Sequence, residues 1–69
     1  MNRIKEVLLE KDLKQIWLAN QLGKSFNMVN GYVQNRRQPK LEDLERIANL
    51  LDVDIRELLV STKPKNRYA

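Results

Sequence analysis

Three uncharged residues lie on the outer face of a segment that has helical apolar spacing: Asn27, Asn30 and Gly31. An asparagine side chain offers a hydrogen-bond donor and an acceptor together, and this pair matches the N6 and N7 edge of adenine. A lysine or a glutamate offers one sign of charge only. The two amides therefore indicate contact with base edges. The alternative is that they fill an exposed helix surface without a function.

Basic residues follow these amides directly. The loop from Asn35 to Lys40 carries Arg36 and Arg37, and Pro39 prevents the preceding helix from continuing. Residues 1 to 40 hold eight basic and three acidic residues, a net charge of +5, whereas residues 41 to 60 hold two basic and six acidic residues, a net charge of −4. This division predicts one face for a polyanion and another turned away from it. A solvated surface with segregated charges is the alternative.

The composition of the 69-residue chain argues against most enzyme chemistry. Without cysteine or histidine it lacks thiolate nucleophiles, disulfides and the commonest metal ligands, so we expect no enzyme, no metal and no cofactor. Asp52 and Asp54 are better interpreted as helix-end and capping residues than as a catalytic pair. No apolar run approaches the roughly 20 residues of a membrane span, and Met1 to Lys11 does not resemble a signal peptide. We expect a soluble, cytoplasmic protein.

Helical periodicity organises the chain as far as residue 60, and no strand is expected. The length, with 42% hydrophobic residues, predicts one small domain over residues 1–60 with a single modest core. Residues 61–69 are polar and basic and are expected to form a flexible tail. The predicted helices span residues 2–11, 15–22, 26–34, 41–51 and about 55–60.

The ends and inner faces of these helices also follow from residue type. Asp12 tolerates the left-handed conformation that closes the first helix, and Asp54 can cap the fifth. The apolar stripe of the fourth helix is Leu41, Leu44, Ile47, Ala48 and Leu51, and the apolar face of the fifth is Ile55, Leu58 and Leu59.

Residues 15–34 have the features of two helices joined by a tight turn. Gly23 stands where the end of a helix requires a positive φ, and Ser25 can cap the start of the next helix. Ala19 lies where the second helix would approach the first, and only a small residue fits such a crossing. This arrangement is a helix-turn-helix unit, whose second helix can enter the DNA major groove.

The chain resembles the Cro and repressor type of helix-turn-helix domain, the XRE-like family, over the sequence QIWLANQLGKSFNMVNGYVQNRRQPKLEDLERIANLLDVDIRELL. With the first helix the similarity extends from Arg3 to Val60. It implies an all-α fold, a compact five-helix bundle of the lambda-repressor-like kind, usually dimeric, that binds operator DNA and regulates transcription. The residues at the family's motif positions are Gln15, Leu18, Ala19, Leu22, Gly23, Ser25, Val29, Pro39, Leu41, Leu44, Ala48, Leu51 and the closing VDIRELL.

The same resemblance implies two sets of DNA contacts. One set faces base edges and the other faces the sugar-phosphate backbone, which fixes register without reading sequence. The residues implied for base reading are Phe26, Asn27, Asn30 and Gly31. The residues implied for phosphate contact are Gln15, Lys24, Ser25, Asn35, Arg36, Arg37 and Lys40.

Several residues depart from the family pattern. Lys24 replaces an apolar residue, so we expect that part of the turn to be exposed. Phe26 replaces a polar residue and could meet a thymine methyl group, its own domain or a partner. Gly31 leaves a gap in the base-reading surface. Leu8 and Val33 replace a charged pair of many relatives, so their interaction should be apolar.

Other uses of the same domain stay open. Antitoxins of this family sequester a toxin protein and regulate their own operon, and other members control restriction and modification genes. A protein-interaction bundle that does not bind DNA is a further alternative, with Trp17, Leu9 and Phe26 as its contact surface.

Two copies of the chain are expected to form the working unit. Three apolar residues near its C-terminal end lie off the main core stripe or close to the end of the fifth helix. Burial between two subunits would add to a small core, and two recognition helices related by a dyad can reach adjacent half-sites of operator DNA. The alternative is that these residues complete the monomer core. The predicted interface residues are Leu50, Leu59 and Val60.

Overall fold

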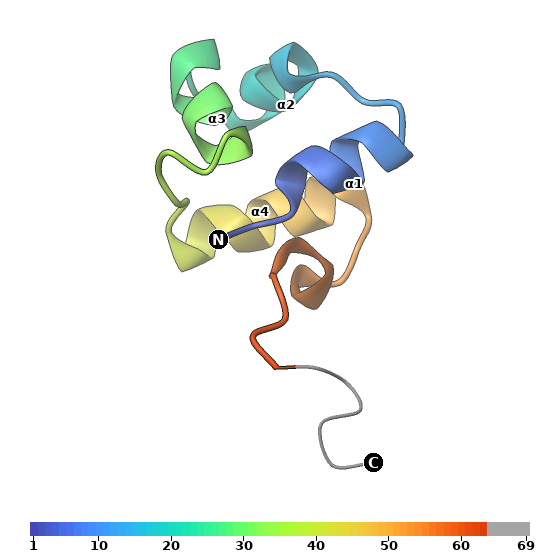
Figure 1. Ribbon diagram of the computed structural model, residues 1–69. Helices are drawn as coiled ribbons and strands as arrows, with labels where there is room; N and C mark the ends of the chain where they lie inside the picture. The colour runs from blue at the N-terminus through green and yellow to red at the C-terminus, as the bar shows by residue number, and fades with distance from the viewer. Residues whose placement is uncertain (64–69) are drawn as a thin grey trace.

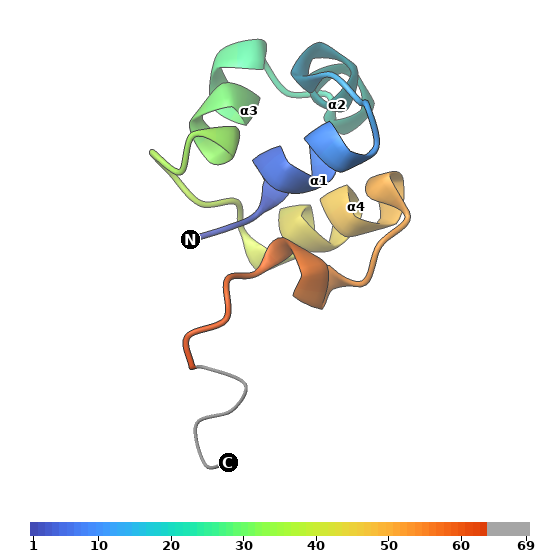
Figure 2. The ribbon, with the colours of Figure 1, turned by 45° about the vertical axis from the view of Figure 1, so that its right-hand side comes forward.

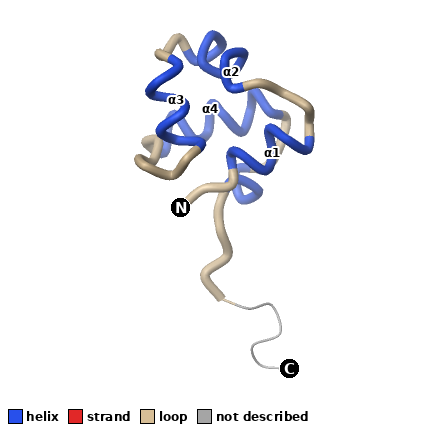
Figure 3. Tube along the Cα trace, turned by 45° about the horizontal axis from the view of Figure 1, so that its top comes forward, coloured by secondary structure: helices blue, strands red, loops and turns tan. Residues whose placement is uncertain are grey.

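Residues 1–63, which the computed structural model describes, form four α-helices and one short 3-10 helix, η1 (Figure 1). Figures 1 and 2 show α2 and α3 at one end of the bundle and η1 at the other, with α1 and α4 between them. Within residues 1–63, extended pairing is confined to one bridge between Asn2 and Leu59, and Figure 3 shows helices and loops only. The predicted all-α class is confirmed. The helices are α1 (Ile4–Glu10), α2 (Gln15–Leu22), α3 (Phe26–Val33), α4 (Leu41–Leu51) and η1 (Ile55–Leu58).

Each α-helix is followed within two residues by a residue with positive φ: Asp12 at 55°, Gly23 at 67°, Asn35 at 60° and Asp52 at 56°. The same pair of hydrogen bonds closes all four ends. After α2, for instance, the Gly23 N–H bonds the carbonyl of residue 20 at 3.3 Å, and the next N–H bonds that of residue 19 at 3.1 Å. This is the Schellman arrangement, which satisfies carbonyls that the helix leaves unpaired. The positive φ expected at Asp12 and Gly23 is confirmed, whereas the one at Asn35 was not predicted.

Two helix starts are closed by the side chains that the sequence indicates. The Ser25 hydroxyl accepts a hydrogen bond from the Met28 N–H at 3.1 Å and so caps α3. Asp54 accepts from the Arg56 N–H at 2.8 Å, and the Glu57 carboxylate accepts from the Asp54 N–H at 3.1 Å, which completes a capping box at η1. The hydrogen bond that the Arg56 side chain donates holds the pKa of Asp54 below its ordinary value.

One apolar core joins all five elements. Leu8 of α1 and Val33 of α3 are 3% and 2% exposed and belong to this cluster, so the apolar character predicted for this pair is confirmed. Trp17 is half-buried against the same cluster. The buried residues of the cluster are Ile4, Val7, Leu8, Leu18, Ala19, Leu22, Val29, Tyr32, Val33, Leu44, Ile47, Ala48, Leu51 and Leu58.

Two apolar predictions are wrong at the ends of elements. The fifth helix is a single 3-10 turn, and Leu59 lies beyond it in extended conformation, φ −109° and ψ 147°, where it pairs with Asn2 and is 46% exposed. Leu41, the first residue of α4, is 72% exposed and so does not join the core. Helical spacing alone continues a stripe past the point where the helix stops contacting its neighbours.

Part of the predicted tail, residues 64–69, lies outside the described residues. No helix within residues 1–63 combines the length and the apolar character needed to cross a membrane.

Candidate nucleic-acid interface

The turn between α2 and α3 fixes how the second helix is presented. Gly23 turns the chain with φ 67°, and the next N–H bonds the carbonyl of Ala19. Ala19 is 1% exposed, as expected of a small residue at a helix crossing. The start of α3 is therefore held against α2 while the opposite side of α3 faces outward.

The residues implied for base reading differ in how freely they are presented. Phe26 and Asn27, in the first turn of α3, are exposed. The structure gives the Asn27 side chain no hydrogen-bond partner within residues 1–63, so its donor and acceptor are both available to a ligand. Asn30 is half-buried and Gly31 is buried.

Asn30 is the centre of a polar chain that joins three elements. Its Nδ2 donates to Gln15 Oε1 at 2.9 Å, and its Oδ1 accepts from Arg36 Nη2 at 2.7 Å. The chain runs from the first residue of α2 through α3 to the loop beyond it. An amide held on both sides orients its neighbours, so in this structure Asn30 positions Gln15 and Arg36.

Gly31 does not leave the gap that the sequence suggests. The side chain of Arg37 lies across it, and a Cβ at position 31 would come within 3.0 Å of Arg37 Cδ and 3.2 Å of Cγ. The Gly31 carbonyl also accepts from the backbone N–H groups of Arg36 and Arg37, at 2.9 and 3.3 Å. The glycine thus allows the arginine loop to fold back onto α3, and its surface is covered by Arg37.

The loop between α3 and α4 carries three cations, of which Arg36 and Arg37 contact the second half of α3. Arg36, Arg37 and Lys40 are exposed, and none of them forms an ion pair with a carboxylate within residues 1–63. Such side chains suit phosphate oxygens, because a guanidinium or ammonium group that already has a carboxylate partner binds a second anion less well.

Comparison with known proteins places these features in a family. The family model described as helix-turn-helix matches residues 4–58. The chain belongs to this helix-turn-helix family, in its Cro and repressor, XRE-like branch.

A curated relative and a solved structure accompany the family match. The chain is 34% identical over 58 residues to RstR, the transcriptional repressor of the cryptic phage CTXphi of Vibrio cholerae. The match covers 84% of this chain and 52% of RstR, so the chain spans about half the length of that relative. A crystal structure of a candidate DNA-binding protein from Bacteroides fragilis superposes with a TM-score of 0.83 at 48% identity, covering 84% of this chain and 94% of the other.

Two of the residues assigned to phosphate contact are engaged elsewhere in this helix-turn-helix domain. Lys24 is not an exposed part of the turn, because its Nζ lies 3.4 Å from Asp43 Oδ2 of α4 and its side chain is only 26% exposed. Arg46 contacts the same carboxylate at 3.7 Å. Asn35 bonds the backbone of Asn2 through both ends of its amide. Fewer side chains are therefore free to bind phosphate than the sequence predicts.

The aromatic ring of Phe26 lines an apolar groove beside the start of α3. Leu9 and Ile16, 72% and 51% exposed, line the same groove, with buried Leu8 and Val33 at its base. Of the three residues proposed as a contact surface, Leu9 and Phe26 line this groove, whereas Trp17 packs on the core. Phe26 is therefore a lining residue of the groove and, at 46% exposed, also part of the surface of α3.

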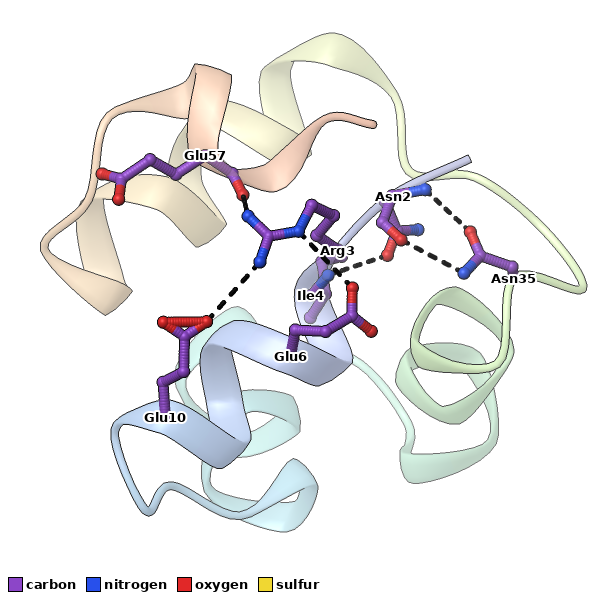
Figure 4. Close-up of polar contacts among 7 residues, drawn as sticks. All are labelled: Asn2, Arg3, Ile4, Glu6, Glu10, Asn35 and Glu57. Carbon is purple, nitrogen blue, oxygen red and sulfur yellow. Dashed lines mark hydrogen bonds and ion pairs between the residues drawn. The ribbon is translucent and has the colours of Figure 1, made fainter. Parts of the chain in front are cut away.

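Sequence reasoning missed Asn2 and Gln38. Asn2 is 4% exposed and its amide donates to the Tyr32 carbonyl at 2.9 Å and to Gln38 Oε1 at 2.8 Å. Figure 4 shows its backbone facing the Asn35 amide. No local sequence pattern predicts these contacts, because the partners lie about 30 or more positions apart. The one signal in the sequence for a role of Asn2 is its position two residues before Ile4, where the apolar spacing begins. Within residues 1–63, no group of acidic residues could hold a metal ion.

Proposed function

We propose that the chain is a sequence-specific DNA-binding transcriptional regulator, a repressor that acts as a dimer on a palindromic operator. The observation that carries the proposal is the outer face of α3, where the amide of Asn27 is exposed and unpartnered within residues 1–63. One helical turn further along α3, Arg36 bonds Asn30 and Arg37 covers Gly31. Membership of the helix-turn-helix family supports it, as does the likeness to RstR.

The two groups of residues would divide the work of binding. Arg36, Arg37 and Lys40 would neutralise phosphates on the strand that borders the major groove, and this part of the affinity would not depend on sequence. Asn27 would offer its amide to a base edge, and Phe26 could contact a thymine methyl group.

The exposed apolar groove favours a protein partner in addition to DNA. An antitoxin uses the same domain to bind DNA and a toxin, and Leu9, Ile16 and Phe26 form an apolar surface of the kind that protein partners cover. This is the second candidate function. Neither candidate assigns the chain a catalytic step, and both place it in the cytoplasm with its operator.

Selection of bound duplexes from a random DNA library with the purified protein tests the proposal. We expect enrichment of a two-fold symmetric site whose half-sites lie about 34 Å apart, one helical turn. Asn49→Ala, an exposed asparagine on α4, serves as the matched control and should recover the same site. If the wild-type protein recovered no preferred sequence, the result would contradict the proposal and favour the alternative, a protein-interaction bundle that does not bind DNA.

A further inference from the structure

Asn2 is a polar residue in an otherwise apolar interior. Its Nδ2 donates to the Tyr32 carbonyl at 2.9 Å and to Gln38 Oε1 at 2.8 Å, and its Oδ1 accepts from the Ile4 N–H at 3.0 Å. Both protons of the amide are therefore used to hold the end of α3 and the loop beyond it. A buried amide with every proton satisfied specifies one arrangement, because any other leaves an unpaired polar group.

Asn35, in the loop after α3, also bonds Asn2, through the Asn2 backbone. Its Oδ1 accepts from the Asn2 N–H at 2.8 Å, and its Nδ2 donates to the Asn2 carbonyl at 3.2 Å (Figure 4). Gln38 Nε2 closes the ring by donating to Asn35 Oδ1 at 3.1 Å. Three residues, Asn2, Asn35 and Gln38, thus form one closed set of hydrogen bonds across the chain.

This ring brackets the two arginines. Arg36 and Arg37 stand between Asn35 and Gln38, in a stretch of the loop that has no helix or strand of its own. Their backbone N–H groups both bond the Gly31 carbonyl. Apart from that carbonyl, the backbone of both arginines is held by the two anchors that flank them, and both anchors bond Asn2. The side chains have contacts of their own, because the Arg36 guanidinium donates to Asn30 Oδ1 at 2.7 Å and the Arg37 side chain lies over Gly31.

Asn2 is itself fixed from the opposite side. It pairs with Leu59, and the Arg3 N–H bonds the Leu58 carbonyl at 2.8 Å. The Arg3 guanidinium bonds the Glu57 carbonyl at 3.2 Å and lies 3.6 Å from the carboxylates of Glu6 and Glu10 (Figure 4). The anchor of the loop is therefore attached to α1 and to the end of η1, and does not move with the loop alone.

We propose that Asn2 is a positioning residue for DNA binding, which holds the loop after α3 so that Arg36 and Arg37 face phosphates. The inference rests on the proposed function, and it assigns to a residue far from α3 in sequence a part in the affinity for DNA. It predicts that removal of Asn2 weakens the binding of phosphates, so the effect should be similar on any sequence.

The test compares Asn2→Ala with the wild-type protein on two probes, the duplex recovered by selection and a scrambled duplex of the same length. We expect weaker binding to both by a similar factor, and a salt dependence shallower by about one unit for each phosphate that the variant no longer binds. Asn49→Ala is the side-chain control. Ile47→Val, fully buried on α4, is the control for lowered stability, and it should bind DNA as the wild type does while folded.

A double-mutant cycle separates positioning from general stability. If Asn2 places Arg37, then Arg37→Ala should cost less affinity in the Asn2→Ala background than in the wild type. Additive effects, or wild-type affinity of the folded Asn2→Ala protein, would overturn the inference. Should Asn2→Ala fail to fold, Asn35→Gly removes the ring from its other side while keeping the positive φ, and the same outcomes apply.

Amide hydrogen exchange of the free protein distinguishes failure of this inference from failure of the proposed function. Asn2→Ala should speed exchange at Arg36 and Arg37 relative to Ile47→Val, whether or not the wild type recovers a DNA site. Unchanged exchange there refutes the positioning role, whereas absence of any enriched site refutes the proposed function.

Discussion

At the scale of single residues, the two asparagines of α3 have different surroundings and should have different roles. The amide of Asn27 has no partner within residues 1–63, whereas Asn30 is bonded to Gln15 and Arg36. We expect Asn27→Ala to cost roughly 1 to 3 kcal/mol at one or two base pairs and to relax the preference there. Asn30→Ala should weaken binding more evenly, because it releases two other side chains.

The measurement for both asparagines is the affinity for the selected duplex and for its single-base variants. If neither substitution changes the preference for any base, the outer face of α3 does not read sequence. If Asn30→Ala alone changes it, Asn30 exchanges its present partners for a base on binding.

The two glycines should respond oppositely to alanine. Gly31 lies within α3 at an ordinary helical φ, and the Arg37 side chain that covers it is exposed and can move aside. Gly31→Ala should therefore raise the free energy of unfolding by about 0.5 to 1 kcal/mol while weakening DNA binding, since Arg37 is displaced. Gly23→Ala should lower the free energy of unfolding by about 1 to 2 kcal/mol, because residue 23 has a φ of +67°, which is unfavourable for a residue with a side chain. Denaturant titrations and binding to the selected duplex check both; unchanged affinity of the Gly31 variant would show that the covering side chain is dispensable.

At the scale of elements, the short helix η1 should lose stability in acid. The bond from Arg56 lowers the pKa of Asp54 below the ordinary value of about 3.9. A carboxyl group whose pKa is lower in the folded than in the unfolded state makes its full contribution to the free energy of unfolding at pH values above the ordinary pKa. It loses that contribution as the pH falls through the lowered pKa. Melting temperatures between pH 7 and pH 2 should fall less for Asp54→Asn, which keeps a capping side chain without the titration, than for the wild type. Equal pH profiles would contradict this.

The α-helices were predictable because their signals are local. Apolar spacing and the residues Gly23, Ser25 and Asp54 give the bounds of α2, α3 and α4 and two of the caps, since these depend on neighbours within one or two turns. The length of η1 was not predictable in this way. It ends where Leu59 leaves helical φ and pairs with Asn2, a contact between the two ends of the domain.

The candidate site was predictable in outline for the same reason. The exposure of Asn27 and Arg36 follows from their place on α3 and after it. The ion pair of Lys24 with Asp43 and the bonds of Asn35 with Asn2 do not, because each joins segments whose approach only the tertiary fold determines.

At the scale of the whole molecule, the division of charge should set the strength of DNA binding. Replacing Arg36 and Arg37 with alanine should weaken binding to all duplexes by a similar factor and reduce the slope of log affinity against log salt by about 2, one for each phosphate contact. Filter binding between about 50 and 200 mM salt, with Arg56→Ala as the control at the far end of the domain, measures this. A weakening confined to one sequence would instead assign the arginines to base edges.

Assembly is the remaining property of the whole molecule, and the C-terminal surface is its predicted site. Leu59 and Val60, consecutive residues after η1, are each 46% exposed, and Leu50 is half-buried on α4. A domain of this size draws little more than about 3 to 5 kcal/mol from its own core, so covering these side chains with those of a second copy would add to its stability. One copy would also reach only a few base pairs, whereas two copies related by a dyad reach half-sites on one face of the duplex. Leu59→Glu with Val60→Glu should therefore shift the sedimentation coefficient from dimer to monomer and weaken binding to the palindromic duplex. Leu41→Glu, at a residue 72% exposed at the start of α4, should leave the sedimentation coefficient unchanged. A wild-type monomer that binds one to one to a site without symmetry would exclude this dimer.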